Sequence, residues 1–508
     1  MKSTIIYLSA FLIFTGAFML SGKETKTNIN SSNLVLLPVK DDPTISFRIW
    51  FKAGSQNDPD GKDGLALLTA MMLTDGGTKN NNYEKVLEKL YPMASSYGSK
   101  VDKEMTVIYG RTHKDNLKSY YSLFSDAILK PAFANEDFQR IKSNILNFIE
   151  NDLRYSSDEE LGKATLYKYI FEHTKYEHLT EGSIQSLKNI TLDDVKNFYH
   201  KYYTKDNVVL GVGGCYNESD IKKIQTDFSK LPEGKIQDTP KPQPEKIDGL
   251  NLFIVDKKCD ATAISFGFPI DILRGDKDFF ALALFVSWFG EHRNSSSHLY
   301  QVIREQRGMN YGDYAYIETF LDGSSLQMPD PNNARKQQIF EVWLRPVQHI
   351  HRHFVLRAAM RELQKVVDNG MTNEDFEITK KFLNKYALNY APTTNKKLGY
   401  ALDSKFYGID KEGDYISLFR KNINELTLEQ VNNAIKKHIQ YNNIKIGIVT
   451  DNAQKFKEQL VNDVPSPIKY DTPKPPAVLF EDKQIEKYPL KILPEKVKIV
   501  KIDDMFVK

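Results

Sequence analysis

Several residue types that would indicate particular classes of protein are scarce in this chain. Its 508 residues include only two cysteines, Cys215 and Cys259, which are too few for a disulfide framework. In an oxidising compartment the two could pair, although free or structural thiols are the expected state. The formal net charge is only +3, and the lysines are scattered along the chain. The sequence therefore indicates neither a nucleic-acid partner nor an anionic surface as a ligand.

Long apolar runs are missing too, except at the amino terminus. Lys2 precedes an apolar run from Ile5 to Leu20, and polar residues follow it as far as Ser32. This run is short for a membrane span but suits the core of a signal peptide. We expect residues 1–32 to be a signal peptide, or an uncleaved anchor that tethers the protein to a membrane, with a polar leader. The protein is then exported to the periplasm or cell envelope.

No histidine precedes His113. This absence matters for GLALLTAMMLTDGGT, residues 64–78, an apolar run of helical length that closes on Gly77 and Thr78. Catalytic zinc needs three protein ligands from histidine, carboxylate or thiolate, together with a water. The leucines of this run offer none of these, and a methionine thioether is too soft a donor to hold Zn²⁺ alone. The run predicts a buried core helix.

Two pairs of similar segments show that the chain contains an internal repeat. NEDFQRIKSNILNFIEN starts at Asn135, and NEDFEITKKFLNKYALN starts 238 residues later at Asn373. TLDDVKNFYHKYYTKDNVVLGVG starts at Thr191, and TLEQVNNAIKKHIQYNNIKIGIV starts 236 residues later at Thr427. Because both pairs occur in the same order at nearly the same offset, we infer that one domain has been duplicated.

Composition divides the chain around these two copies. Strand-like stretches such as SFRIWFKAG, whose alternation predicts a half-buried strand, are separated by long helical patterns, so each copy should be an α+β domain. The predicted segments are a first domain at 33–232, a proline-rich linker at 233–247, a second domain at 248–463 and an extended C-terminal arm at 464–508. The arm contains seven of the chain's 21 prolines.

The second copy contains SSSHLYQVIREQRGMNYGDYAYIE, residues 295–318. Leu299, Val302 and Ile303 form an apolar helical stripe, and Gly308 suits the position just after a helix. A strand should follow. Arg304 would then lie in the last helical turn and Tyr311 at the start of the strand, so their side chains can converge.

Taken together, the repeat and these motifs resemble the insulinase and mitochondrial-processing-peptidase family of zinc proteases, also called the pitrilysin family. The resemblance covers about residues 33–463 and implies two homologous domains in a clamshell. In active members a His-x-x-Glu-His motif follows the position of Gly64, and Leu67, Ala70 and Met71 occupy its three functional positions here. The third ligand of active members is a glutamate in a later helix, and its position falls at Glu150, or at Phe148, which offers no donor, when the apolar pattern is aligned instead. The resemblance therefore implies a degenerate zinc motif.

Two histidine clusters elsewhere in the chain contain candidate metal ligands. HTKYEH, residues 173–178, has one residue too many between its histidines, which would lie about 140° apart on a helix. Its position also matches a loop of the family. HIHRH, residues 349–353, could hold a metal in principle, but a polar entry to a helix is the favoured interpretation.

The family resemblance also assigns a role to Arg304 and Tyr311. The Arg-x6-Tyr pair in the second half of family members is understood to bind substrate carbonyls and to support the oxyanion during peptide hydrolysis. The resemblance thus implies a zinc-free subunit that binds peptide substrate and pairs with a zinc-bearing homologue, the zinc being held by that partner. Two alternatives remain: a pseudo-peptidase that binds peptides or acts as a scaffold without a catalytic partner, and a stand-alone hydrolase that uses HIHRH.

Overall fold

The computed structural model describes residues 31–234, 239–291, 296–320 and 328–508. The apolar run predicted as a signal peptide or anchor lies outside these residues. Within the described ranges, no helix is both long enough and apolar enough to cross a membrane. Cys215 and Cys259 are both free thiols.

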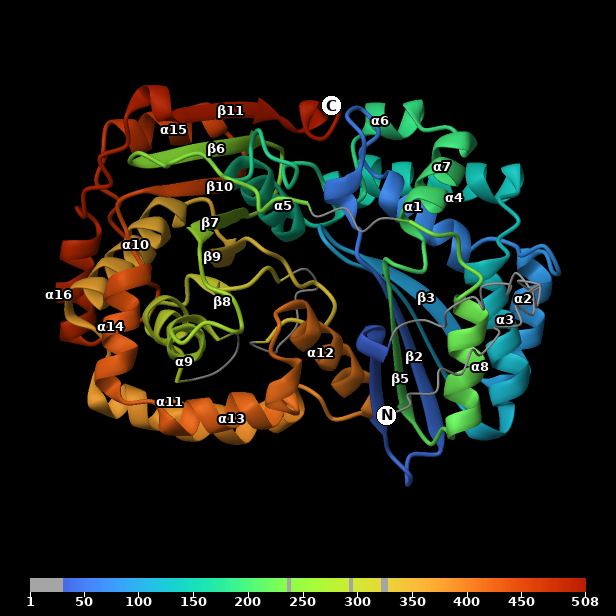
Figure 1. Ribbon diagram of the computed structural model, residues 1–508. Helices are drawn as coiled ribbons and strands as arrows, with labels where there is room; N and C mark the ends of the chain where they lie inside the picture. The colour runs from blue at the N-terminus through green and yellow to red at the C-terminus, as the bar shows by residue number, and fades with distance from the viewer. Residues whose placement is uncertain (1–30, 235–238, 292–295, 321–327) are drawn as a thin grey trace, which may run out of the picture.

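Two β-sheets with matching topology form the centres of the two halves of the molecule (Figure 1). The first sheet has the order β1-β5-β2-β4-β3 and the second β11-β6-β10-β7-β9-β8. The first contains β1 (Leu34–Pro38), β2 (Thr44–Phe51), β3 (Ser96–Val101), β4 (Thr106–His113) and β5 (Val208–Gly214). The second contains β6 (Leu250–Asp256), β7 (Thr262–Ile270), β8 (Asn310–Tyr316), β9 (Gln338–Val347), β10 (Ile444–Thr450) and β11 (Val497–Lys501). Apart from β11, the strand orders correspond one to one, which confirms the predicted α+β duplication.

Helices surround both sheets. Those of the first half are α1 (Leu65–Thr74), α2 (Tyr83–Leu90), α3 (Leu117–Leu129), α4 (Asn135–Asn147), α5 (Asp158–Ile170), α6 (Ile184–Asn189), α7 (Leu192–Tyr202) and α8 (Glu218–Phe228). Those of the second half are α9 (Phe279–Gly290), α10 (Arg352–Asn369), α11 (Asn373–Tyr386), α12 (Thr394–Phe406), α13 (Tyr415–Glu425), α14 (Leu428–His438), α15 (Ala453–Val461) and α16 (Pro476–Ile485). Two π-helical segments, η5 (Phe148–Ser156) and η6 (Tyr300–Glu305), complete the elements that concern the site.

The two halves exchange one helix each. Helix α5 of the first half packs on β7 and β10 of the second sheet, whereas α12 of the second half packs on β1, β2 and β5 of the first sheet. Both helices have 13 residues, and α12 begins 236 residues after α5, which is the offset of the second pair of repeated segments. The exchanged helices are therefore equivalent elements of the duplicated domain.

A glycine lies on the strand beneath each exchanged helix. A Cβ atom on Gly447 of β10 would lie 3.1 Å from the backbone nitrogen of Leu166 in α5. A Cβ atom on Gly211 of β5 would lie 3.3 Å from a methyl carbon of Leu402 in α12. Both leucines are fully buried. At Gly447 an ordinary side chain would push the backbone of α5 away, so this glycine permits the close packing. At Gly211 the added atom would first meet the Arg48 carbonyl oxygen of β2, at 2.8 Å.

Because each sheet is covered on both faces, the predicted half-buried strand is wrong in one respect. Seven of the eight residues of β2 are buried, including Arg48, which the alternation pattern placed towards solvent. The Arg48 guanidinium donates to the Asn332 side chain and, at 3.1 Å, to the backbone carbonyl of Asn395. The polar position of the strand thus faces α12 of the other half rather than water.

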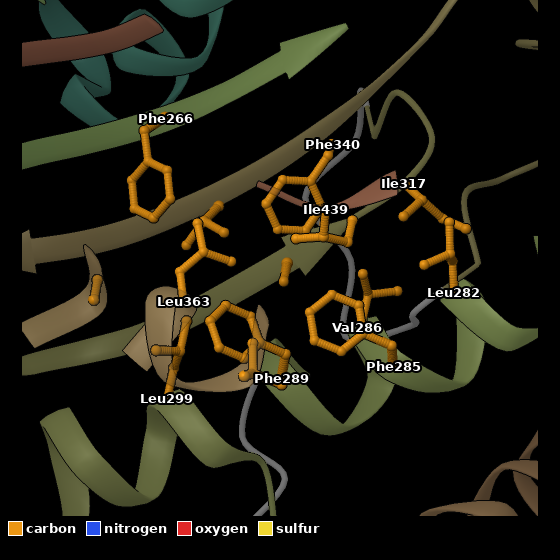
Figure 2. Packing of buried hydrophobic residues seen from close by; sticks show 14 of the residues in the cluster. Phe266, Leu282, Phe285, Val286, Phe289, Leu299, Ile317, Phe340, Leu363 and Ile439 are labelled. Carbon is orange, nitrogen blue, oxygen red and sulfur yellow. The ribbon is translucent and has the colours of Figure 1, made fainter. Parts of the chain in front are cut away.

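Apolar side chains fill the space between each sheet and its own helices. Figure 2 shows this packing in the second half, where Phe285, Val286 and Phe289 of α9 lie close to Phe340 of β9. Every residue of α9 is buried. Burial on all sides explains why this helix is apolar around its whole circumference.

The C-terminal segment, for which the sequence predicts an extended arm, contains a helix and a strand. Helix α16 lies against α10, and β11 pairs in parallel with β6 at the edge of the second sheet. Arg357, which is fully buried, holds the beginning of the segment by donating to the carbonyl oxygens of Val464 and Glu486. Figure 1 shows the chain then crossing to end beside α6 of the first half.

Candidate functional site

Helix α1 starts at a tightly held turn. The buried Asp58 carboxylate accepts hydrogen bonds from the backbone nitrogens of Gly64 and Ala66, both at 2.8 Å. Gly64 has a φ of +96°, and a Cβ atom there would lie 2.4 Å from the carbonyl oxygen of Glu181. Asp58 therefore satisfies N–H groups that would otherwise lack partners at the helix start, and the turn requires glycine.

The three positions of the degenerate zinc motif lie on this helix as apolar residues. Leu67 and Met71, one helical turn apart, are partly buried and pack against the first-half core, and Ala70 is fully buried. Among the residues that the structure describes, no group of three or more histidine, cysteine, aspartate or glutamate side chains is placed to hold a metal. The donor set needed for catalytic zinc is therefore missing from this helix.

The two candidate positions for the third ligand lie in different surroundings. Phe148 begins the π-helical segment η5, is 38% exposed and lines a cavity. The Glu150 carboxylate lies 3.9 Å from the Lys188 ammonium in a half-exposed pair. Glu150 is not among the lining residues of that cavity. Its surroundings are those of a surface carboxylate.

The cavity has a volume of about 540 Å³ and contains contributions from both halves of the molecule. Its walls include Phe148, Lys163 and Tyr167, the turn at Tyr176–Glu181, and Arg335 of the second half. Its size is within the range typical of small-molecule and peptide sites. The cavity belongs to this chain alone and needs no second subunit to form.

A buried ion pair between the halves supports the cavity. The Arg335 guanidinium donates to both carboxylate oxygens of Asp102, with Nε–Oδ2 at 2.6 Å and Nη2–Oδ1 at 2.5 Å. Its third nitrogen, Nη1, has no hydrogen-bond partner among the described residues. Burial lowers the pKa of the neighbouring Lys103 to about 8, and the charge of Arg335 acts in the same direction. The wall therefore presents polar donors within largely apolar surroundings.

The predicted Arg304–Tyr311 pair is assembled in the second half. Arg304 lies in the last turn of η6, and Tyr311 is the second residue of β8, after a turn in which Gly308 has a φ of +68°. The Arg304 guanidinium lies 5.0 Å from the centre of the Tyr311 ring, and its Nη1 donates to the Tyr300 hydroxyl at 3.0 Å. Tyr311 is 49% exposed. The two side chains thus converge at the surface.

A buried carboxyl group, Asp313, lies close enough to this pair to feel the charge of Arg304. Asp313, on the same strand as Tyr311, has no exposed surface. Burial raises the pKa of Asp313 to about 8, although a hydrogen bond from Asn310 and the charge of Arg304 oppose the rise. Asp313 is therefore mostly protonated near neutral pH, and Arg304 contributes a full positive charge. That charge suits a carbonyl oxygen or a developing oxyanion.

Histidines of the two clusters make contacts that stabilise the fold. His178 lies in a turn, with Nε2 at 3.0 Å from the Ser55 carbonyl and 3.4 Å from Asp58. The HIHRH stretch joins β9 to α10, as predicted. His349 bonds to the Thr262 hydroxyl and the Cys259 carbonyl, and burial lowers the pKa of His353 to about 3. Neither cluster gathers three ligands in the part of the chain that the structure describes.

Sequence reasoning missed Asp58 and the ion pair between Asp102 and Arg335. No local pattern marks either, since Asp58 lies in a polar turn and the paired residues are 233 positions apart. The repeat offset could have suggested that α5 and α12 are equivalent, but not that they are exchanged. These features depend on tertiary contacts between segments distant in sequence.

Comparison with known proteins places the chain among peptidase-like folds. Residues 34–179 match the family described as "Insulinase (Peptidase family M16)" and residues 189–383 match "Peptidase M16 inactive domain". The chain is 22% identical over 416 residues to a "Non-peptidase homolog YmxG" of Helicobacter pylori, covering 79% of this chain and 88% of that protein. It is 20% identical to an "Uncharacterized zinc protease YmxG" of Bacillus subtilis, covering 79% and 92%. A solved Pseudomonas fluorescens "peptidase M16 inactive domain" superimposes with a TM-score of 0.72 at 24% identity, covering 82% and 95%.

Proposed function

We propose a function for this chain, which belongs to the insulinase family of peptidases, M16. It is a non-catalytic, substrate-binding subunit of a heterodimeric zinc metallopeptidase. A zinc-bearing homologue would be its partner. The observation that carries the proposal is the contrast between the two halves. The first half has Leu67, Ala70 and Met71 where metal chemistry would be needed, whereas the second half presents an assembled and exposed Arg304–Tyr311 pair.

In this proposal Arg304 and Tyr311 hold the peptide at the partner's reacting centre. The Arg304 guanidinium and the Tyr311 hydroxyl are both hydrogen-bond donors, and a peptide carbonyl accepts more strongly as it becomes an oxyanion. Tyr300 and the Tyr311 ring orient the guanidinium before the substrate arrives, so little reorganisation is needed. In this proposal the partner supplies the metal and the general base, because Leu67, Ala70 and Met71 of α1 can neither hold a metal nor accept a proton. Export to the cell envelope remains part of the proposal.

Mixing the purified chain with its zinc-bearing homologue tests the proposed role. We expect the mixture to cut peptides much faster than either chain alone, and Arg304→Ala to lower kcat/KM by about 10²- to 10³-fold, the usual cost of losing one oxyanion donor. Tyr311→Phe should lower the rate while preserving the fold, since only an exposed hydroxyl is lost. Arg111→Ala, at an exposed arginine on the first sheet, is the matched control. A homologue that is equally active alone, or a mixture unaffected by Arg304→Ala, would contradict the proposal.

The cavity favours one alternative, a peptide-binding protein without a catalytic partner. It forms within a single chain, so it could hold a ligand in the absence of any second subunit. Calorimetric titration of the isolated chain with short peptides distinguishes the two functions. Tight binding that Arg304→Ala leaves unchanged, together with no partner in material purified from the cell envelope, would support the alternative.

A further inference from the structure

The C-terminal strap, defined here as residues 497–508, connects the second half of the molecule to the first. Its first part is β11, whose residues Val497–Lys501 pair with Leu252–Asp256 of β6 in the second sheet. A single turn at Ile502–Asp504 follows. The next residues form hydrogen bonds with the first half, which are described below. The strap is thus anchored firmly in one half and reaches across to the other.

Two side chains of the strap enter the core of the first half. Met505 is 2% exposed and Phe506 is 4% exposed, and both belong to the cluster of buried residues that surrounds the first sheet. Phe506 adopts a φ of +56°, a conformation that residues other than glycine rarely adopt. The buried contacts hold the strap in a backbone conformation that the isolated segment would not favour.

Hydrogen bonds from the first half also hold the strap. The Arg154 guanidinium, which is buried, donates from Nε to the Met505 carbonyl at 2.9 Å. The Tyr155 hydroxyl donates to the Asp503 carboxylate at 2.6 Å. Both donors belong to η5, the segment that begins with Phe148 at the cavity wall. One face of the strap is therefore fixed to the element that leads into α5.

The other contact of the strap is with the start of α6. The backbone nitrogens of Ile184 and Gln185 donate to the carbonyl oxygens of Phe506 and Val507, at 3.0 and 2.9 Å. These N–H groups are at the N-terminus of a six-residue helix, where no carbonyl of the same helix can accept from them. The strap satisfies them, so the position of α6 depends on it.

The loop between α5 and α6 contains part of the cavity wall. Its residues Tyr176–Glu181 line the cavity of about 540 Å³, and Ser183 then caps α6. On its other side the same loop lines a smaller hollow of about 340 Å³, which also includes Lys508 of the strap. The strap therefore holds α6 on one side of this loop while η5 and α5 hold the other side.

We propose that the C-terminal strap is a releasable latch that keeps the α5–α6 loop, residues 171–183, closed against the cavity. When the latch is released, the loop and α6 loosen while both halves keep their folds. The halves remain joined in that state because the exchanged helices α5 and α12 and the Asp102–Arg335 pair lie outside the strap. This inference does not depend on the proposed role of Arg304 and Tyr311.

Hydrogen–deuterium exchange of the full chain tests the latch. A first variant lacks residues 502–508, and a second keeps the full length but carries Met505→Asp and Phe506→Asp, which place carboxylates in the apolar seat. We expect exchange in residues 171–189 to become about tenfold faster or more in both variants, because local opening then costs less. Exchange in β2 (Thr44–Phe51) and α9 (Phe279–Gly290), which report on the two cores, should stay as in the parent chain.

Asp504→Ala is the matched control, because Asp504 is an exposed residue of the strap. It should leave exchange unchanged throughout. Two results would overturn the proposal. Unchanged exchange at residues 171–189 in both latch variants would show that the loop does not depend on the strap. Equal loss of protection in β2 would show that the strap is an integral part of the first-half core and cannot be released on its own.

Discussion

Replacing Asp102 by asparagine should strongly destabilise the contact between the two halves. Asp102 is fully buried, and its carboxylate accepts two hydrogen bonds from the Arg335 guanidinium, which is itself 2% exposed. Arg335 also lies near the rings of Tyr167 and Tyr176, at 5.5 and 5.7 Å, which limit its access to water. Asp102→Asn leaves this cation buried without an anion while keeping the shape of the side chain.

The magnitude follows from the geometry. Two unit charges about 4 Å apart attract by about 4 kcal/mol at an effective dielectric constant near 20. Removing one partner of a buried ion pair typically costs about 3–5 kcal/mol, because the remaining charge loses its compensation without regaining water. We therefore expect Asp102→Asn to lower the free energy of unfolding by about 4 kcal/mol.

Urea denaturation followed by circular dichroism measures this change. Glu218→Gln removes one partner of an exposed pair with Lys222, whose side chains are 82% and 70% exposed, and should cost less than about 1 kcal/mol. The double variant Asp102→Leu, Arg335→Met replaces the pair with apolar side chains and should recover most of the loss. A loss below about 1 kcal/mol for Asp102→Asn, or a double variant no more stable than the single one, would refute the reasoning.

Two further predictions concern the start of α1 and the response to pH. Gly64→Ala should lower the thermal midpoint, with a loss of about 1–3 kcal/mol, because alanine disfavours a φ of +96° and its Cβ would meet the Glu181 carbonyl oxygen; Gly61→Ala, where nothing lies within 4 Å of the added atom, gives the backbone cost alone. Burial raises the pKa of Glu341 from its usual 4.5 to about 7, although Trp343 and Tyr167 donate hydrogen bonds to the carboxylate. Between these pH values the unfolded chain releases a proton that the folded chain keeps, so the free energy of unfolding should fall as pH rises, by up to about 3 kcal/mol. Urea midpoints across that range should fall less steeply in Glu341→Gln than in the parent chain, where Asp313, whose pKa is also raised by burial, adds to the slope. An unchanged slope in the variant would contradict the assignment.

The sequence allowed the duplication and the Arg304–Tyr311 pair to be predicted because both depend on local order along the chain. The repeated segments have the same offset as the repeated elements, and the Gly308 turn brings Arg304 and Tyr311 together whatever the rest of the fold does. The lack of zinc ligands at the motif positions of α1 could also be predicted from the sequence, because it depends on side-chain chemistry alone. The roles assigned to Arg304, Tyr311, Phe148 and Glu150 stay predictions.

Other features could not be read from the sequence because they depend on which surface each element meets. An alternating strand that contains an arginine predicts one solvent-exposed face. Arg48 is nevertheless buried, because α12 of the other half covers that face. The sequence of α5, DEELGKATLYKYI, does not indicate that this helix packs on the second sheet. The proline content of the C-terminal segment likewise suggested an extended chain, although Pro476 begins α16 and β11 follows the last proline, Pro494.

The reciprocal placement of α5 and α12 has a consequence for any chain that contains only one copy of the repeat. Such a chain would leave one face of its sheet bare, because the helix that covers it is supplied by the other copy. Two identical single-copy chains could cover both sheets by trading that helix, as in a domain-swapped homodimer. The present molecule has the architecture of such a dimer fused into one polypeptide, so neither half is a self-sufficient folding unit.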